Sequence, residues 1–164
     1  MEERKVTGNL RIENAKLIFK NFAGNRTDFN AQGSRNFGVL LDDETAERLS
    51  EDGWPVKYLK PREDDPEQYQ QPWMKVKVRF NNYPPIITLI NSRGKKKLTE
   101  ETVDQLDWTI IEKCDLIISP YNYPAMNGRP GGVTGYLKAI YVTIVEDEFE
   151  EKYADLVDLD DLRE

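Results

Sequence analysis

The stretch from Trp73 to Phe80, WMKVKVRF, carries the clearest chemical pattern in the sequence. In a β-strand, alternate residues point to opposite sides. One side would then be apolar, with Met74, Val76, Val78 and Phe80. The other side would hold an indole and three cations: Trp73, Lys75, Lys77 and Arg79. Rings stack on bases and cations neutralise phosphates, so this side predicts a surface for single-stranded nucleic acid. The alternative is an edge strand whose lysines block aggregation.

Other stretches offer further cations and rings. A run after a predicted strand is interpreted as a basic turn that clamps phosphates, or as a solvated hairpin tip; it contains Arg93, Lys95, Lys96 and Lys97. The remaining candidate contacts for nucleic acid are Arg26, Arg35, Lys57, Tyr121 and Tyr123. The arginines and tyrosines have structural alternatives, because arginines pair with acids and tyrosines beside proline pack the end of a barrel.

Catalytic chemistry is strongly limited by composition. Histidine is absent and Cys114 is the single cysteine, which excludes the usual zinc ligand sets and the Ser–His or Cys–His nucleophiles. Six acids near a predicted helix could suggest a metal site: Glu100, Glu101, Asp104, Asp107, Glu112 and Asp115. Their spacing fits surface acids better than a two-metal nuclease. We expect no enzyme, no metal and no cofactor, and Mg²⁺-dependent cleavage would instead support the nuclease alternative.

The charge of the chain is divided unevenly. The net charge is −7, yet residues 146–164 hold ten acids and two bases, which leaves +1 for residues 1–145. This predicts a nucleic-acid-binding domain over 1–145 and an acidic tail over 146–164. Phe149, Tyr153 and Leu156 recur in the tail at helical spacing. The tail could therefore dock on partner proteins, or occupy the basic groove as a mimic of nucleic acid.

Sequence features also bear on location. The chain has no apolar run of roughly 20 residues, and its first residues lack the apolar segment of a signal peptide. A lone cysteine suits a reducing compartment. We expect no membrane association and a cytoplasmic setting in a bacterial cell, with a homodimer left open.

The predicted elements are mostly strands, over 9–22, 35–42, 56–60, 73–80, 85–92, 115–123 and 135–145. A change of phase near Glu13–Asn14 predicts a bulge or bend in the first strand. A helix over 44–52 would be capped by Asp43 and closed by Gly53. A second helix would begin at Thr99, or a turn later at Thr102, whose spacing to Gln105 fits a capping box. A helix between the third and fourth barrel strands is the OB-fold arrangement, so we predict a mainly β, OB-fold-like small barrel with two short helices.

Whole blocks of the sequence add a family resemblance. KNFAGNRTDFNAQGSRNFGV, DGWPVKYLKPRE, VKVRFNNYPPIITLINSRGKKKL, CDLIISPYNY and GYLKAIYVTI resemble phage-encoded single-stranded DNA-binding proteins over roughly residues 9–150. The resemblance implies an OB-fold barrel, a basic and aromatic groove for single strands and no catalysis. It also implies an acidic C-terminus that recruits replication or recombination partners. Many such tails end in an aromatic residue, whereas this one ends Leu162–Arg163–Glu164. The alternative function is a protein-interaction adaptor or a phage structural protein.

Overall fold

The computed structural model describes residues 6–28 and 30–145. In this part of the chain, nine strands form one sheet, accompanied by one α-helix and one short 3-10 helix. The strands are β1 (Leu10–Ile12), β2 (Leu17–Asn21), β3 (Arg35–Leu40), β4 (Val56–Tyr58), β5 (Pro72–Val78), β6 (Ile86–Asn91), β7 (Gly94–Leu98), β8 (Ile111–Tyr123) and β9 (Gly132–Ile144). The helices are α1 (Asp43–Asp52) and η1 (Val103–Asp107). The prediction of a mainly β chain is confirmed.

A bend between β1 and β2 closes the sheet on itself. The strand order runs β1-β8-β9-β5-β3-β2, so two strands that follow each other in the chain stand at opposite ends of the order. The predicted change of phase is this bend, where Asn14 adopts a φ of 53°. Ala15 N–H donates to the Cys114 carbonyl at 2.7 Å, and Leu40 N–H donates to the Lys16 carbonyl at 2.9 Å. The bent strand is therefore bonded to β8 at one end and to β3 at the other.

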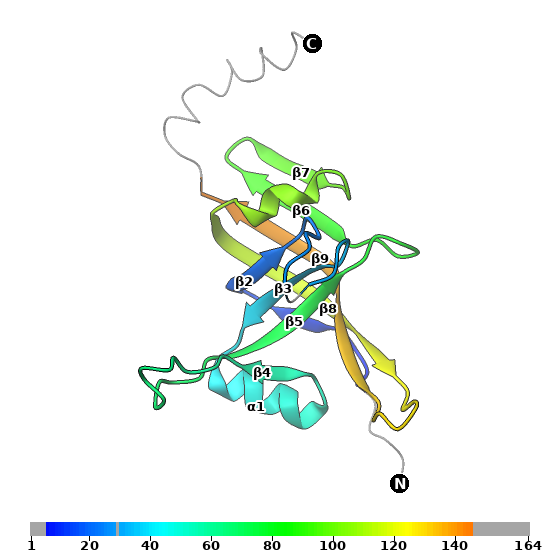
Figure 1. Cartoon of the computed structure of the whole chain (residues 1–164). Helices are drawn as coiled ribbons and strands as arrows, with labels where there is room; N and C mark the ends of the chain where they lie inside the picture. Colours follow the sequence, from blue (N-terminus) through cyan, green and yellow to red (C-terminus); the bar gives the residue numbers. More distant parts are fainter. Residues whose placement is uncertain (1–5, 29, 146–164) are drawn as a thin grey trace.

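With β1 and β2 counted as one strand, the ring contains five strands in the order β1/β2, β3, β5, β9, β8. β5 pairs with β9 in parallel, whereas the other neighbours in the ring are antiparallel. The short helix η1 lies in the chain between β5 and β8. This connectivity is that of an OB-fold barrel. The β6–β7 hairpin is added beside it, because β6 pairs with β9 further along the strand (Figure 1).

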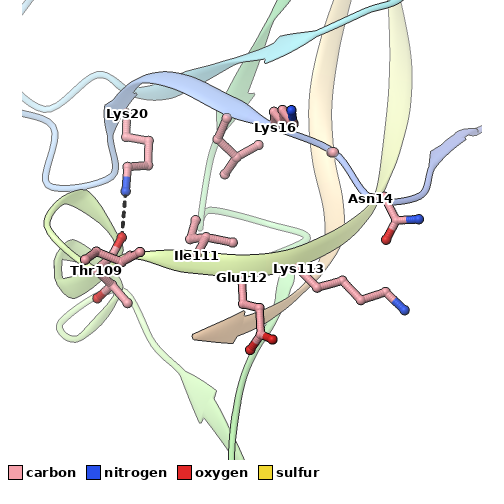
Figure 2. Close-up of a pocket in the computed structure, with 10 residues that line it drawn as sticks. Asn14, Lys16, Lys20, Thr109, Ile111, Glu112 and Lys113 are labelled. Carbon is pink, nitrogen blue, oxygen red and sulfur yellow. Dashed lines mark hydrogen bonds between the residues drawn. The ribbon is translucent and has the colours of Figure 1, made fainter. Parts of the chain in front are cut away.

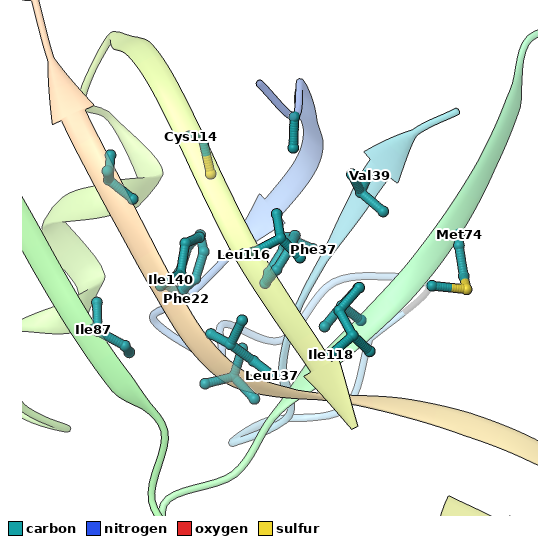
Figure 3. Packing of buried hydrophobic residues seen from close by; sticks show 14 of the residues in the cluster. Phe22, Phe37, Val39, Met74, Ile87, Cys114, Leu116, Ile118, Leu137 and Ile140 are labelled. Atoms are coloured by element: carbon teal, nitrogen blue, oxygen red, sulfur yellow. The ribbon is translucent and has the colours of Figure 1, made fainter. Parts of the chain in front are cut away.

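The core fills the inside of this ring. Phe22 and Phe37 stack with centroids 5.1 Å apart, and side chains from β5, β8 and β9 surround them (Figure 3). Burying each large apolar side chain contributes about 1.5–3 kcal/mol. Cys114 belongs to this core, and burial raises the pKa of its thiol to about 12. The lone cysteine is therefore a packing residue and not a thiolate.

The first helix differs from the prediction at its start, and the second starts at one of the two predicted positions but differs in type. The N-cap of α1 is Asp42 and not Asp43, because the Asp42 carboxylate accepts the Thr45 N–H at 2.7 Å. The helix ends at Gly53 as predicted, with a φ of 108°. The other helix starts after Thr102, but it is a five-residue 3-10 turn. Its capping box does not form, because the Thr102 hydroxyl accepts the Thr99 N–H at 2.8 Å and stays turned upstream.

In residues 6–28 and 30–145, no helix is long and apolar enough to cross a membrane.

Candidate nucleic-acid interface

Strand β5 separates an apolar side from a basic and aromatic side. Met74, Val76 and Val78 are buried in the core, whereas Trp73, Lys75 and Lys77 are half-buried on the outer surface. The alternation predicted from the sequence is confirmed over this strand. Arg79 lies just beyond the last strand residue and is exposed.

The alternative of an edge strand is wrong for β5. The strand pairs with β3 along six residues on one edge, and with β4 and then β9 on the other. Lysines that protect an exposed edge need a free edge to protect. Those of β5 instead lie in the middle of a curved sheet, where their ammonium groups share one surface.

Trp73 rests directly on the backbone of the neighbouring strand. A Cβ added at Gly38 would lie 2.8 Å from the indole Cε3 and 2.9 Å from Ile18 Cγ1, so only glycine leaves room for the ring. The Lys57 ammonium lies over the indole, 5.5 Å from the ring centroid. Cation–π contact of this kind contributes about 0.5–1 kcal/mol at exposed sites. Lys57, a candidate contact in the sequence, thus lies on the same surface as Trp73.

Phe19 adds a second exposed ring beside Trp73, and the sequence analysis missed it. Its ring meets Trp73 edge to face at 5.2 Å, and 62 % of the residue is exposed. The register of β2 against β3 shifts between Ile18 and Asn21, and Phe19 adopts a φ of 50° inside that bulge. A bulky residue rarely takes this conformation, which costs on the order of 1 kcal/mol or more. The bulge turns outward a ring that simple alternation groups with Leu17.

The cations of this surface have no acidic partner in the described residues. Ion pairs there engage cations such as Arg35, Arg62 and Lys113. None engages the four cations near the indole, which are Lys57, Lys75, Lys77 and Arg79. The pKa of Lys75 is lowered, first by burial and then by repulsion from Lys57 and Lys77. Unpaired cations that repel one another gain when an anion arrives between them.

A second set of rings continues the surface across β9 and β8. Tyr136 is the register neighbour of Lys77, and the Arg79 guanidinium lies 4.9 Å from the Tyr136 ring centroid. Tyr121 meets Tyr136 edge to face at 6.2 Å. Tyr136 is a second residue that the sequence analysis missed, because only the pairing of β5 with β9 brings it beside Lys77. Tyr123 is 42 % exposed and lies close over Gly132, beside this cluster on the β8–β9 hairpin.

The two candidate arginines of the first hairpin, Arg26 in the loop and Arg35 at the start of β3, differ from each other. Arg26 is exposed on the loop. Arg35 is engaged within the protein, since its Nε donates to the Phe22 carbonyl at 2.9 Å and its Nη1 lies 3.2 Å from Glu100 Oε1. Its guanidinium also lies 5.4 Å from the Phe80 ring centroid. Those contacts fix the loop against the barrel, so Arg35 is less accessible to a ligand than Arg26.

The lysine run lies on a strand, which corrects the prediction of a basic turn. Lys95, Lys96 and Lys97 belong to β7, and each is paired across to β6. Successive residues of a strand face opposite sides, so Lys96 points away from its two neighbours. The run therefore forms no single track of cations. Arg93 precedes the strand, and its N–H donates to Asn91 Oδ1 at 2.9 Å.

Two of the six acids considered for a metal site, Asp107 and Asp115, bind backbone N–H groups. The Asp107 carboxylate accepts the N–H groups of Phe22 and Ala23, and Asp115 accepts the Asn14 N–H. The residues that the structure describes contain no cluster of three or more potential metal ligands. The tail residues Phe149, Tyr153 and Leu156 lie outside the described residues.

Comparison with known families identifies the class of protein to which the chain belongs. The family model "Putative phage ssDNA-binding domain" matches residues 1–162. The chain belongs to this family. Its members are non-enzymatic proteins, and single-stranded DNA is accordingly the ligand of this chain. No curated protein sequence matches the chain.

Solved structures agree on the fold. The chain is similar to the single-stranded DNA-binding protein from bacteriophage Enc34, with 9% identity and a TM-score of 0.52 over 92% of this chain and 90% of that chain. A second structure of that protein, in complex with ssDNA, gives 9% identity and a TM-score of 0.52 over 87% of this chain and 89% of that chain. At such low identity these likenesses establish the shared fold of the phage proteins.

Proposed function

We propose that the outer surface of β5 and its neighbours is where this chain binds single-stranded DNA. This surface, here called the β5 face, consists of Phe19, Lys57, Trp73, Lys75, Lys77, Arg79, Tyr121 and Tyr136. One observation carries the proposal: an indole and two lysines share the open side of an internal strand, and the described residues offer them no carboxylate. The strand that carries them is the third of the OB barrel, and it pairs with the second, β3. The face of these two strands binds oligonucleotides in other OB-folds.

The chemistry of the β5 face fits binding without regard to base sequence. Every base has a flat π-face, so stacking on Trp73 or Phe19 tolerates any base and contributes about 1–3 kcal/mol each. Lysine ammonium groups contact phosphates, which every nucleotide carries. Binding of this kind suits a protein that covers single strands during phage DNA replication or recombination in the cytoplasm of a bacterial host cell. The Enc34 protein of the same fold is known in complex with ssDNA, which supports the assignment.

Two parts of the proposal rest on sequence alone. Residues 146–164 are proposed as a separate acidic tail after the binding domain, and Phe149, Tyr153 and Leu156 as contacts for replication or recombination proteins. Arg26, Tyr123, Arg93 and the β7 lysines are proposed as outlying contacts that a long strand reaches beyond the β5 face.

Tryptophan fluorescence tests the position of the DNA. The chain has three tryptophans. Trp54 is buried, and Trp108, which follows η1, is 69 % exposed. We expect oligo-dT to quench the fluorescence, and Trp73→Phe to remove most of that quenching. The matched control Trp108→Phe should keep it. Quenching that persists in the Trp73 variant and vanishes in the Trp108 variant would place the DNA elsewhere.

Salt dependence tests the phosphate contacts in the same titration. Affinity should fall as salt rises, with a slope of roughly 0.7 for each phosphate contact. A flat response over a broad range of salt would contradict a surface whose cations meet phosphates.

A further inference from the structure

The barrel is left unpaired along one seam, between β2 and the beginning of β8. Among the described residues, β2 beyond Ala15 pairs only with β3 and stands at the end of the strand order. Within the same part of the chain, Ile111 and Lys113 of β8 pair only with β9. A cavity of about 520 Å³ lies between the two strands and is bordered by both (Figure 2). Each strand therefore presents a free edge to this seam, and such edges accept an added extended segment.

The seam carries positive charge. Lys16, Lys20 and Lys113 line it, against a single acid, Glu112. Lys20 reaches across the seam and donates from Nζ to the Thr109 carbonyl at 3.0 Å. Burial lowers the pKa of Lys20, and attraction to Asp107 partly opposes that shift. Lys113 lies 3.9 Å from Asp115 with more than half of its side chain exposed, a geometry that stabilises little.

An apolar shelf adjoins the mouth of the seam. Trp108 and Ile110 are 69 % and 70 % exposed, and Val145 is 48 % exposed. Val145 N–H donates to the Ile110 carbonyl at 2.9 Å, which places the last described residue beside the cavity lining. Exposed apolar groups that adjoin unpaired strand edges mark a surface suited to a partner segment.

We propose that residues 146–164 of the same chain dock in this seam, separately from the DNA. These residues lie outside the described part of the chain, and their sequence complements the surface: a net charge of −8, with Phe149, Tyr153 and Leu156 among the acids. They follow Val145 directly, so the segment starts at the mouth of the seam. Nineteen residues reach up to roughly 60 Å when extended, which is ample.

Position favours the seam over the β5 face. Tyr136 lies eight residues before Ile144, the last residue of β9, which is a separation of roughly 26 Å along the strand. A tethered segment meets a site at its own anchor at a high effective concentration, on the order of millimolar for short linkers. Docking of the segment in the seam does not depend on where the chain binds DNA, so the two proposals can be tested separately.

A paramagnetic label on the full chain tests the docking. Cys114 is buried and the pKa of its thiol is about 12. A thiol-reactive nitroxide reagent should therefore label an Ala154→Cys variant at the new thiol alone. We expect amide signals of Lys16, Lys20, Ile111 and Lys113 to lose intensity, and to recover at high salt as screening increases. Loss centred on the β5 face would overturn the proposal, and so would the absence of any localised loss.

A mixing experiment separates docking within one chain from docking between chains. Labelled chain is mixed with isotope-enriched chain that carries no label, and the signals of the enriched chain are recorded. The enriched seam signals should stay intact. Their loss would assign the segment to a second copy and overturn docking within one chain.

Charge reversal tests the contribution of the seam lysines. The double variant Lys16→Glu, Lys113→Glu should abolish the broadening at the seam. The matched control, Lys60→Glu with Arg62→Glu, alters the charge equally on the loop before β5 and should preserve the broadening. Persistent broadening in the seam variant would overturn the proposal. Both double variants should bind oligo-dT as the parent does, which separates this test from that of the β5 face.

Discussion

Strands β5 and β7 each carry several cations, yet they present them in opposite ways. In β5 the cations alternate with buried residues, so Lys75 and Lys77 project together from the middle of the sheet. In β7 the three lysines are consecutive, and Lys96 faces away from Lys95 and Lys97. β7 pairs only with β6 in the described residues, so it is an edge strand. Spacing and neighbours, and not the number of charges, decide whether cations converge on one surface.

The interpretation of lysines as protection of a free edge, first considered for β5, applies to β7. Lysines that discourage edge-to-edge pairing are expected on a free edge, and β7 is such an edge. The protective role considered for β5 therefore fits β7. The rings follow the same division, because Phe19, Trp73 and Tyr136 gather on the β5 face.

The strongest test of the difference between β5 and β7 is to remove equal charge from each strand. Lys75→Ala with Lys77→Ala should weaken binding to oligo-dT by about 25-fold at low salt, at ~1 kcal/mol or more for each phosphate contact. The salt slope should fall by roughly 1.4. Lys95→Ala with Lys97→Ala removes the same charge and should change affinity by less than about 3-fold. Equal losses in the two double variants, measured by fluorescence titration, would erase the distinction between the strands.

The rings allow a second, smaller contrast. Phe19→Ala should weaken binding by about 5-fold or more, because one base–ring stack contributes ~1–3 kcal/mol. Tyr69→Ala is a suitable control, since Tyr69 is 60 % exposed but bonded to Asp43 beside the acidic start of α1. If both changes leave affinity intact while the melting temperature stays constant, Phe19 is not a stacking residue.

The smallest expected effect concerns pH. The lowered pKa of Lys75 means that its ammonium loses its proton, and its attraction for phosphate, earlier than an ordinary lysine as pH rises. As pH rises from neutral to about 9.5, affinity should fall more in the parent than in Lys75→Arg, because arginine stays charged. Oligo-dA is the ligand to use, since thymine itself titrates near that pH. An identical decline in both proteins would remove Lys75 from the contact surface.

The sequence predicted the parts of this site that local periodicity controls. The alternation of WMKVKVRF placed Trp73, Lys75 and Lys77 on one side, since a strand has a fixed period of two. The bend near Asn14 was visible as a change of phase in the apolar pattern, and the end of α1 as a glycine, which accepts a positive φ readily. The strand order of the barrel agrees with the predicted OB-fold-like arrangement.

What the sequence did not reveal depends on register and long-range pairing. Phe19 turns outward only because of a bulge against β3, and Tyr136 meets Lys77 only because β5 and β9 pair in parallel. In the sequence Arg35 looks like a cation available to a ligand, and only the fold reveals its contacts with Phe22 and Glu100. Such contacts have no local pattern, so single-sequence reasoning has nothing to detect.

The left-handed backbone at Phe19 sets fold stability against function. Glycine accepts this conformation without strain, so Phe19→Gly should raise the melting temperature or leave it unchanged while it removes the exposed ring. A stabilising substitution that weakens DNA binding would mean that selection has kept a costly residue for the ligand it holds. Directed evolution for heat resistance alone would then be expected to discard Phe19 early, and with it part of the protein's hold on DNA.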